Sequence, residues 1–125
     1  MLRPDRIELT GLRAFGHHGA LERERRDGQT FAVDLALELD LSAAAAGDDL
    51  SATVHYGELA ERVVAAVGSS RFDLIEALAN HLAELVLSDT RVAAVTVRVA
   101  KPDAPIPVPF DEVAVVLRRA RDGAA

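Results

Sequence analysis

Lys101 is the residue whose position most directly suggests chemistry. It ends the run of residues 95–101, in which Val95, Val97 and Val99 alternate with other residues, and Pro102 follows it. Because side chains of a strand alternate between two faces, Lys101 shares a face with the valines. Such an amine either reaches out to water at the mouth of the fold or lies in a partly desolvated site, where it can exchange protons near neutral pH. The spacing leaves both interpretations open.

Glu76 and Tyr56 both lie at predicted helix starts. Glu76 stands three residues after Asp73, so the two can form a cap in which Asp73 is the N-cap residue. Alternatively, the Glu76 carboxylate can hold a planar ligand that offers two adjacent N–H donors. Tyr56, the only tyrosine, is either a core or interface anchor, or a ring that stacks on a ligand and a hydroxyl that donates a proton.

The remaining polar clusters carry weaker signals. Glu24 is flanked by charges of both signs, a pattern typical of a solvated loop. The histidines show no spacing that supports a three-histidine zinc site, and two adjacent ones would point to opposite sides of a strand. These residues are His17, His18, His55 and His81. The chain has no cysteine nucleophile, no phosphate-binding glycine loop and no Gly-x-Ser-x-Gly elbow.

Length and composition predict one domain over residues 1–125. Half of the residues are hydrophobic, which is enough for a core without disulfides, and there are no cysteines to form them. A net charge of −6 without a basic stripe argues against a nucleic-acid partner. The charged N-terminal residues lack an apolar signal core, and no apolar run is long enough to span a membrane. We therefore expect a cytoplasmic protein with neither nucleic acid nor membrane as partner.

The hydrophobic periodicity positions these residues on six main elements. Period-2 alternation predicts strands at residues 6–13, 31–41, 92–101 and 113–117, and helical periodicity predicts helices at 56–67 and 73–87. Residues 42–47 predict one helical turn with Ser42 as its cap. The order β-β-α-α-β-β predicts an α+β fold, with a four-stranded antiparallel sheet and both helices on one face. Small apolar residues on the other face, such as Ala32 and Ala36, favour self-association.

Six short motifs occur in a characteristic order between residues 18 and 107. They are His18-Gly19-Ala20-Leu21 with Glu24, Gly28-Gln29-x-Phe31, Asp48-Asp49-Leu50, Thr53-Val54-His55-Tyr56, Leu74-Ile75-Glu76-x-Leu78-Ala79 and Lys101-Pro102-x-Ala104-Pro105-Ile106-Pro107. In this order the chain resembles the dihydroneopterin aldolase family of the tunnelling-fold (T-fold) superfamily. The resemblance implies the same β-β-α-α-β-β order that the periodicity predicts.

The resemblance also implies a reaction and an assembly. Family members cleave 7,8-dihydroneopterin by a retro-aldol step to 6-hydroxymethyl-7,8-dihydropterin and glycolaldehyde, in folate biosynthesis, and many epimerise the substrate at C2′. They use no metal, no Schiff base and no cofactor, because the pterin ring accepts the electrons. They assemble as rings of four that stack into octamers, with active sites between subunits.

Specific residues match the family's functional positions. By this resemblance Glu76 grips the amino-pyrimidinone edge of the pterin, and the backbone of Ile75 touches the ring. Lys101 matches the general acid/base, Tyr56 the tyrosine that helps to protonate the enol-type intermediate, and Glu24 the glutamate beside the hydroxylated tail. The resemblance thus replaces the solvated-loop interpretation of Glu24.

Other functions remain open at this point. Within the same fold, the chain could be a dihydroneopterin triphosphate 2′-epimerase or a variant with added oxygenase activity. A zinc-dependent T-fold lyase would need several convergent histidines. A ring-forming pterin-binding protein without turnover is the non-enzymatic alternative.

Overall fold

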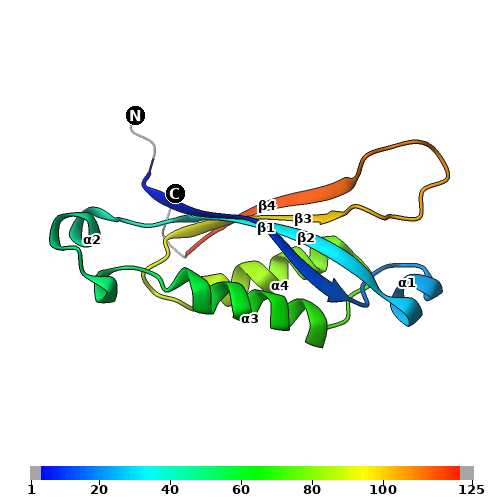
Figure 1. Ribbon diagram of the computed structural model, residues 1–125, viewed down its shortest axis with the longest axis horizontal. Helices are drawn as coiled ribbons and strands as arrows, with labels where there is room; N and C mark the ends of the chain where they lie inside the picture. Colours follow the sequence, from blue (N-terminus) through cyan, green and yellow to red (C-terminus); the bar gives the residue numbers. More distant parts are fainter. Residues whose placement is uncertain (1–3, 122–125) are drawn as a thin grey trace.

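The computed structural model describes residues 4–121, which form one antiparallel sheet with two long helices against one of its faces (Figure 1). The strands are β1 (Arg6–Gly16), β2 (Gln29–Glu38), β3 (Ala94–Lys101) and β4 (Val113–Ala120), in the spatial order β1-β2-β3-β4. The long helices are α3 (Tyr56–Ser69) and α4 (Ile75–Leu87). The predicted α+β architecture, with two hairpins around a helix pair, is confirmed.

The core fills the space between the sheet and the two helices. Every second residue of β2 from Phe31 to Leu37 is buried, and so are Val95, Val97 and Val99 of β3. The helices contribute apolar residues at helical spacing, namely Leu59, Val63 and Val67 from α3 and Leu78, Leu82 and Val86 from α4. Each such side chain contributes about 1.5–3 kcal/mol when it leaves water. The face of β3 that Lys101 shares is therefore the core face.

Three short elements lie between the main ones: α1 (Glu22–Asp27), the predicted turn α2 (Ser42–Gly47) and a 3-10 turn, η1 (Leu50–Ala52). The charged stretch after β1 is helical because its acidic residues lie in the first turn and its basic residues in the last, which suits the helix dipole. The turn at residues 42–47 is as predicted, but Leu41 is its N-cap residue. The hydroxyl of Ser42 donates instead to Asp40, at 2.6 Å.

β1 runs three residues beyond its predicted end, to Gly16. A bulge between Leu9 and Leu12 breaks the alternation from which the strand end was predicted. Gly11 lies in the bulge with φ of +75°, a conformation that favours glycine, and its N–H donates to the carboxylate of Asp34 at 2.7 Å. The bulge therefore lets the strand continue toward the loop that carries His17 and His18.

The start of α4 differs from the prediction. The helix begins at Ile75, its N-cap residue is Leu74 and no side chain caps it, so the prediction of Asp73 as the cap was wrong. The carboxylate of Asp73 lies instead 3.7 Å from the guanidinium of Arg25. Leu74 is 52% exposed and does not belong to the apolar stripe of the helix. Glu76 consequently has no capping partner at Asp73, and its side chain is exposed.

Candidate active site at the end of the sheet

The C-terminal end of β3 meets the first helix at an ion pair. The ammonium of Lys101 donates to Oε2 of Glu24 at 2.9 Å, and only 14% and 6% of the two side chains are exposed. Lys101 is thus largely removed from water and does not reach out into it; its role in proton exchange stays a prediction. The solvated-loop interpretation of Glu24 was wrong, because α1 turns this carboxylate inward while its neighbours in the sequence face water.

Glu24 is held by three donors. Besides Lys101, the side-chain amide of Gln29 donates to Oε2 at 2.9 Å, and the backbone N–H of Leu21 donates to Oε1 at 3.3 Å. Burial alone would raise the pKa of Glu24, but these hydrogen bonds outweigh it and lower the pKa below its ordinary value. The site therefore contains a carboxylate that stays ionised well into the acid range, paired with a cation.

Gly19 allows the chain to lie directly against this carboxylate. Its φ is +152°, and a Cβ at this position would lie 2.4 Å from Cδ and Oε1 of Glu24. The N–H of Gly19 donates to the carbonyl of Phe72 at 3.0 Å, which joins the loop to the residues before α4. A side chain at residue 19 would have to displace Glu24.

His18 has a structural role that sequence reasoning did not find. The ring is fully buried, its Nδ1 accepts the N–H of Phe72 at 3.0 Å, and its Nε2 lies 2.8 Å from the carbonyl of Val67. Nε2 therefore carries the proton and donates. Burial lowers the pKa of His18, although the bond to Val67 acts to raise it, so the ring is neutral. His18 thereby ties the loop after β1 to the end of α3 and to the entrance of α4.

Arg25 strengthens the same connection from α1. Its guanidinium donates to the carbonyls of Gly19 and Ala20 at 3.1 and 2.7 Å, and it faces Asp73. The helix that carries Glu24 is thus connected to the chain that leads into α4. Within residues 4–121, no group of three or more histidine, cysteine or acidic side chains has the arrangement of a metal site.

Glu76 and Ile75 occupy the first turn of α4, at the same end of the sheet as Lys101. The opposite end of α4 leads through a short turn into the start of β3, so the helix start and the strand end lie together (Figure 1). The first N–H groups of a helix have no partner within it. Ala77 and Leu78 are the first α4 residues whose N–H groups reach a backbone carbonyl, that of Leu74. The N–H groups of Ile75 and Glu76 precede them and have no partner within the helix.

Tyr56 lies at the other end of the molecule. It is the first residue of α3, whereas His18 binds the carbonyl of Val67 near the end of that helix. The 14 residues of α3 separate the two ends by about 20 Å. The Tyr56 ring is 58% exposed, so it is not a core anchor. Within one chain the structure brings Glu24 and Lys101 together, with Glu76 at the same end, and leaves Tyr56 apart.

Each end of the molecule carries an open hollow. One, of about 280 Å³, lies beside Glu24, Gln29 and Pro105. The other, of about 310 Å³, lies between Leu50 and Tyr56. Of the residues predicted from the sequence to form the site, Glu24 lines the first hollow and Tyr56 the second.

Comparison with known proteins points to one family. A family model described as dihydroneopterin aldolase matches residues 7–118. A dihydroneopterin aldolase from Streptomyces coelicolor is 54% identical over 117 residues, which cover 94% of this chain and 98% of the relative. The structure of Escherichia coli dihydroneopterin aldolase in complex with neopterin matches with a TM-score of 0.84 and 28% identity, covering 93% of this chain and 99% of that one. A dihydroneopterin aldolase from Burkholderia thailendensis bound to guanine matches with a TM-score of 0.76 and 27% identity, covering 94% and 92%.

Proposed function

The chain belongs to the dihydroneopterin aldolase family, and from this premise we propose that its substrate binds between Lys101 of one subunit and Tyr56 of another. The family reaction is a lyase reaction of folate biosynthesis, the retro-aldol cleavage of 7,8-dihydroneopterin. It breaks the bond between C1′ and C2′, releases glycolaldehyde and leaves 6-hydroxymethyl-7,8-dihydropterin. The protein has to orient the substrate and move protons, because the imine of the pterin ring accepts the electron pair of the broken bond.

The observation that carries this proposal is the pair between Lys101 and Glu24. Glu24, which lines the hollow of about 280 Å³, holds the amine of Lys101 at 2.9 Å from its carboxylate, and the hydroxylated tail of the substrate binds in this hollow. Lys101 then acts, through a water, as the base: its neutral amine takes the hydroxyl proton during cleavage, and Glu24 stabilises the ammonium that results. A positioned proton transfer of this kind contributes about 10²- to 10⁴-fold in rate. The oxygens of Glu24 accept hydrogen bonds from the tail.

Glu76 and Ile75 bind the pterin ring. The carboxylate of Glu76 accepts the two adjacent N–H groups of the amino-pyrimidinone edge in a fork, while the backbone of Ile75 contacts the ring. The guanine bound to the Burkholderia relative supports this assignment, because guanine carries the same pair of N–H donors as a pterin. The neopterin bound to the Escherichia coli relative supports a pterin as the ligand.

Tyr56 reaches the substrate from a neighbouring subunit and helps to protonate the carbon that leaves the cleavage step as an enol-type intermediate. Its separation from Lys101 within one chain supports this arrangement. The outer strands β1 and β4 each pair on one side only, and Val116 of β4 is 60% exposed. Such edges favour closure into a ring. We expect a ring of four subunits that stacks into an octamer.

The direct test is an assay with 7,8-dihydroneopterin and chromatographic separation of the products. We expect 6-hydroxymethyl-7,8-dihydropterin as the main product and some 7,8-dihydromonapterin from epimerisation. Accumulation of dihydromonapterin alone would favour the epimerase, and 7,8-dihydroxanthopterin would favour the oxygenase. Tight neopterin binding without any product would favour a binding protein.

Two further expectations stay predictions. None of the helices within residues 4–121 is long and apolar enough to cross a membrane. The cytoplasmic location stays a prediction, which cell fractionation would test. The assignment of residues 1–125 to one T-fold domain includes residues 1–3 and 122–125, which lie outside the described part of the chain.

A further inference from the structure

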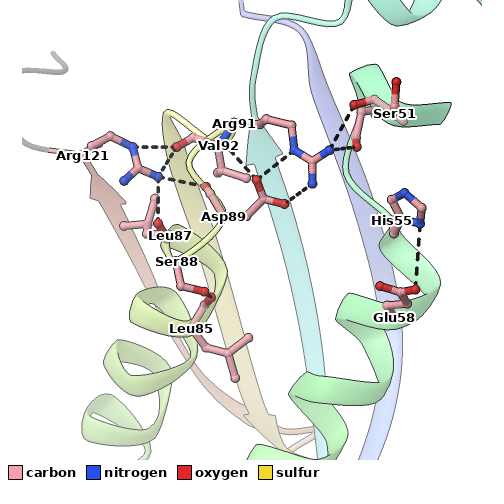
Figure 2. A network of polar contacts seen from close by, with 11 residues as sticks. Ser51, His55, Glu58, Leu85, Leu87, Ser88, Asp89, Arg91, Val92 and Arg121 are labelled. Atoms are coloured by element: carbon pink, nitrogen blue, oxygen red, sulfur yellow. Dashed lines mark hydrogen bonds and ion pairs between the residues drawn. The ribbon is translucent and has the colours of Figure 1, made fainter. Parts of the chain in front are cut away.

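Arg91 connects the turn after α4 to the segment that leads into α3 (Figure 2). Its Nε and Nη2 atoms donate to the two carboxylate oxygens of Asp89, at 3.0 and 2.8 Å. Its remaining nitrogen, Nη1, donates to the carbonyl of Thr53 at 2.5 Å and to that of Ser51 at 3.4 Å. One guanidinium thus joins two segments that lie almost 40 residues apart in the chain, as the separation of 38 between Arg91 and Thr53 shows.

The guanidinium is itself firmly anchored. Oδ1 of Asp89 also accepts the backbone N–H of Arg91 at 3.0 Å, which fixes the carboxylate relative to the turn. Arg121, which directly follows β4, holds the same turn by donating to the carbonyls of Leu87, Asp89 and Val92. The hydrogen bond from Arg91 is the main reason that the pKa of Asp89 is lowered, so the pair stays charged far into the acid range. Arg91 is therefore a fixed support for whatever it binds on the other side.

On its other side Arg91 binds the carbonyls of Ser51 and Thr53, in the segment that leads to Tyr56. Thr53 precedes Tyr56 by three residues, its backbone is extended, and the side chain of Val54 is buried in the core. His55 is the N-cap residue of α3 and makes no side-chain capping bond. The burial of Val54 and the hydrogen bond from Arg91 to Thr53 hold the chain just before the helix, and the carbonyl of His55 accepts the N–H of Leu59 at 3.0 Å.

Packing alone does not hold this segment. A cavity of about 190 Å³ lies beside it, lined by Val54, His55 and Glu58 on one side and by Asp89 and Arg91 on the other. Atoms that face a cavity lack contacts on that side, so they gain little from packing and have room to shift. Arg91 and Asp89 line this cavity, and the hydrogen bond from Arg91 to Thr53 adds a polar contact to the segment beside it.

We infer that Arg91 is a positioning residue for Tyr56: it holds the carbonyl of Thr53 so that the tyrosine enters the neighbouring subunit's site in the reactive orientation. This inference rests on the proposed function of Tyr56. Arg91 touches neither the substrate nor Lys101 in its own chain, and its whole effect on the reaction passes through the segment of residues 51–56. An error of about 1 Å in such a position can cost about 10²-fold in rate.

The test is a double-mutant cycle with Arg91→Met, Tyr56→Phe and the combined variant, each assayed as the purified assembly with 7,8-dihydroneopterin. Arg119→Met is the matched control, because Arg119 also makes a hydrogen bond between elements, to Oδ1 of Asn80 at 3.1 Å, but binds neither the turn after α4 nor residues 51–56. We expect Arg91→Met to lower kcat by about tenfold or more while KM changes by less than about twofold. The control should keep a kcat within about twofold of the wild type. In the Tyr56→Phe background, Arg91→Met should cause almost no further loss.

The outcomes separate this inference from the proposed function. If Tyr56→Phe lowers kcat and Arg91→Met does not, the inference is overturned and the role of Tyr56 stands. If neither variant affects kcat, both are overturned. If the two losses multiply in the combined variant, Arg91 acts through general stability and the inference is again overturned. Should Arg91→Met fail to fold, Arg91→Lys replaces it: its single ammonium cannot span both segments, so the same loss of kcat and the same non-additivity with Tyr56→Phe are expected.

Discussion

The ammonium of Lys101 lies 2.9 Å from a carboxylate oxygen of Glu24, although 77 residues separate them in the chain. Two elements create this contact: β3, which carries the amine to the end of the core face, and α1, which turns the carboxylate inward. Because both side chains are largely removed from water, neither is stable there without the other. The pair therefore connects the folding of this end of the sheet to the chemistry proposed for it.

Removing the amine of Lys101 should strongly lower turnover but leave neopterin binding almost unchanged. We expect Lys101→Ala to lower kcat by about 10²-fold or more, because the proton transfer loses its carrier. The Kd for neopterin, measured by fluorescence titration, should change by less than about fivefold, since Glu76 holds the ring. Loss of the partner also leaves the buried carboxylate of Glu24 without its countercharge, so the free energy of unfolding should fall by about 1–3 kcal/mol.

Removing the carboxylate of Glu76, which is proposed to hold the pterin ring, should have the opposite effect and weaken binding. We expect Glu76→Ala to weaken neopterin binding by about 10²-fold, because a charge-assisted fork of two hydrogen bonds is lost. Glu84→Ala is the matched control, because Glu84 lies near the other end of α4, where it accepts a hydrogen bond from Asn80. Equal loss of affinity in Glu76→Ala and Lys101→Ala would contradict the division of roles between these two residues.

Mixing inactive subunits tests whether the site is shared. Subunits of Lys101→Ala and Tyr56→Phe are dissociated, combined in equal amounts and reassembled. If each site takes Lys101 from one chain and Tyr56 from the next, about one quarter of the interfaces in random rings are intact and that fraction of wild-type activity returns. If both residues act within one chain, no intact site can form and the mixture stays as inactive as its components.

The stability of the protein should depend on pH through Glu24. Its pKa is lower in the folded state than its ordinary value of 4.5, so its stabilising contribution is complete above that value. As the pH falls through the folded pKa, the carboxylate is protonated and the contribution is lost. We expect the difference in unfolding free energy between wild type and Glu24→Gln to be constant above about pH 5.5 and to shrink below about pH 4 in urea titrations. A difference that does not change between pH 7 and pH 3 would contradict the buried pair.

A side chain at residue 19 should disturb the site without touching the substrate. In Gly19→Ala the new Cβ would lie 2.4 Å from the Glu24 carboxyl, and φ of +152° is strained for alanine, so we expect a loss of about 1–3 kcal/mol and a lower kcat. Gly47→Ala is the control, because its Cβ would meet only Asp49 at 3.9 Å. Thermal unfolding and turnover of the two variants provide the comparison, and equal behaviour would show that the loop adapts.

Part of the fold and site could be predicted because the responsible physics is local. The period-2 alternation of β2 and β3 identified the core face, and with it the unusual position of Lys101. The helix start at residue 56 follows from the change to helical periodicity, whereas α4 begins later than predicted, at Ile75. The capping role assigned to Asp73 failed because its carboxylate faces Arg25, a residue of another element that no local pattern reveals.

Sequence by itself therefore determined the order of the elements and the buried face of each. It also determined that Lys101 ends a strand and that Glu76 and Tyr56 lie at helix starts. Only the tertiary structure decided that Glu24 is buried, that His18 and Arg25 bind the loop to α4, and that Arg91 supports the approach to Tyr56. The physical reason is the range of the interactions. Periodicity reports how each residue faces its near neighbours, whereas a buried charge is stable only beside a specific partner, which the packing of distant elements supplies.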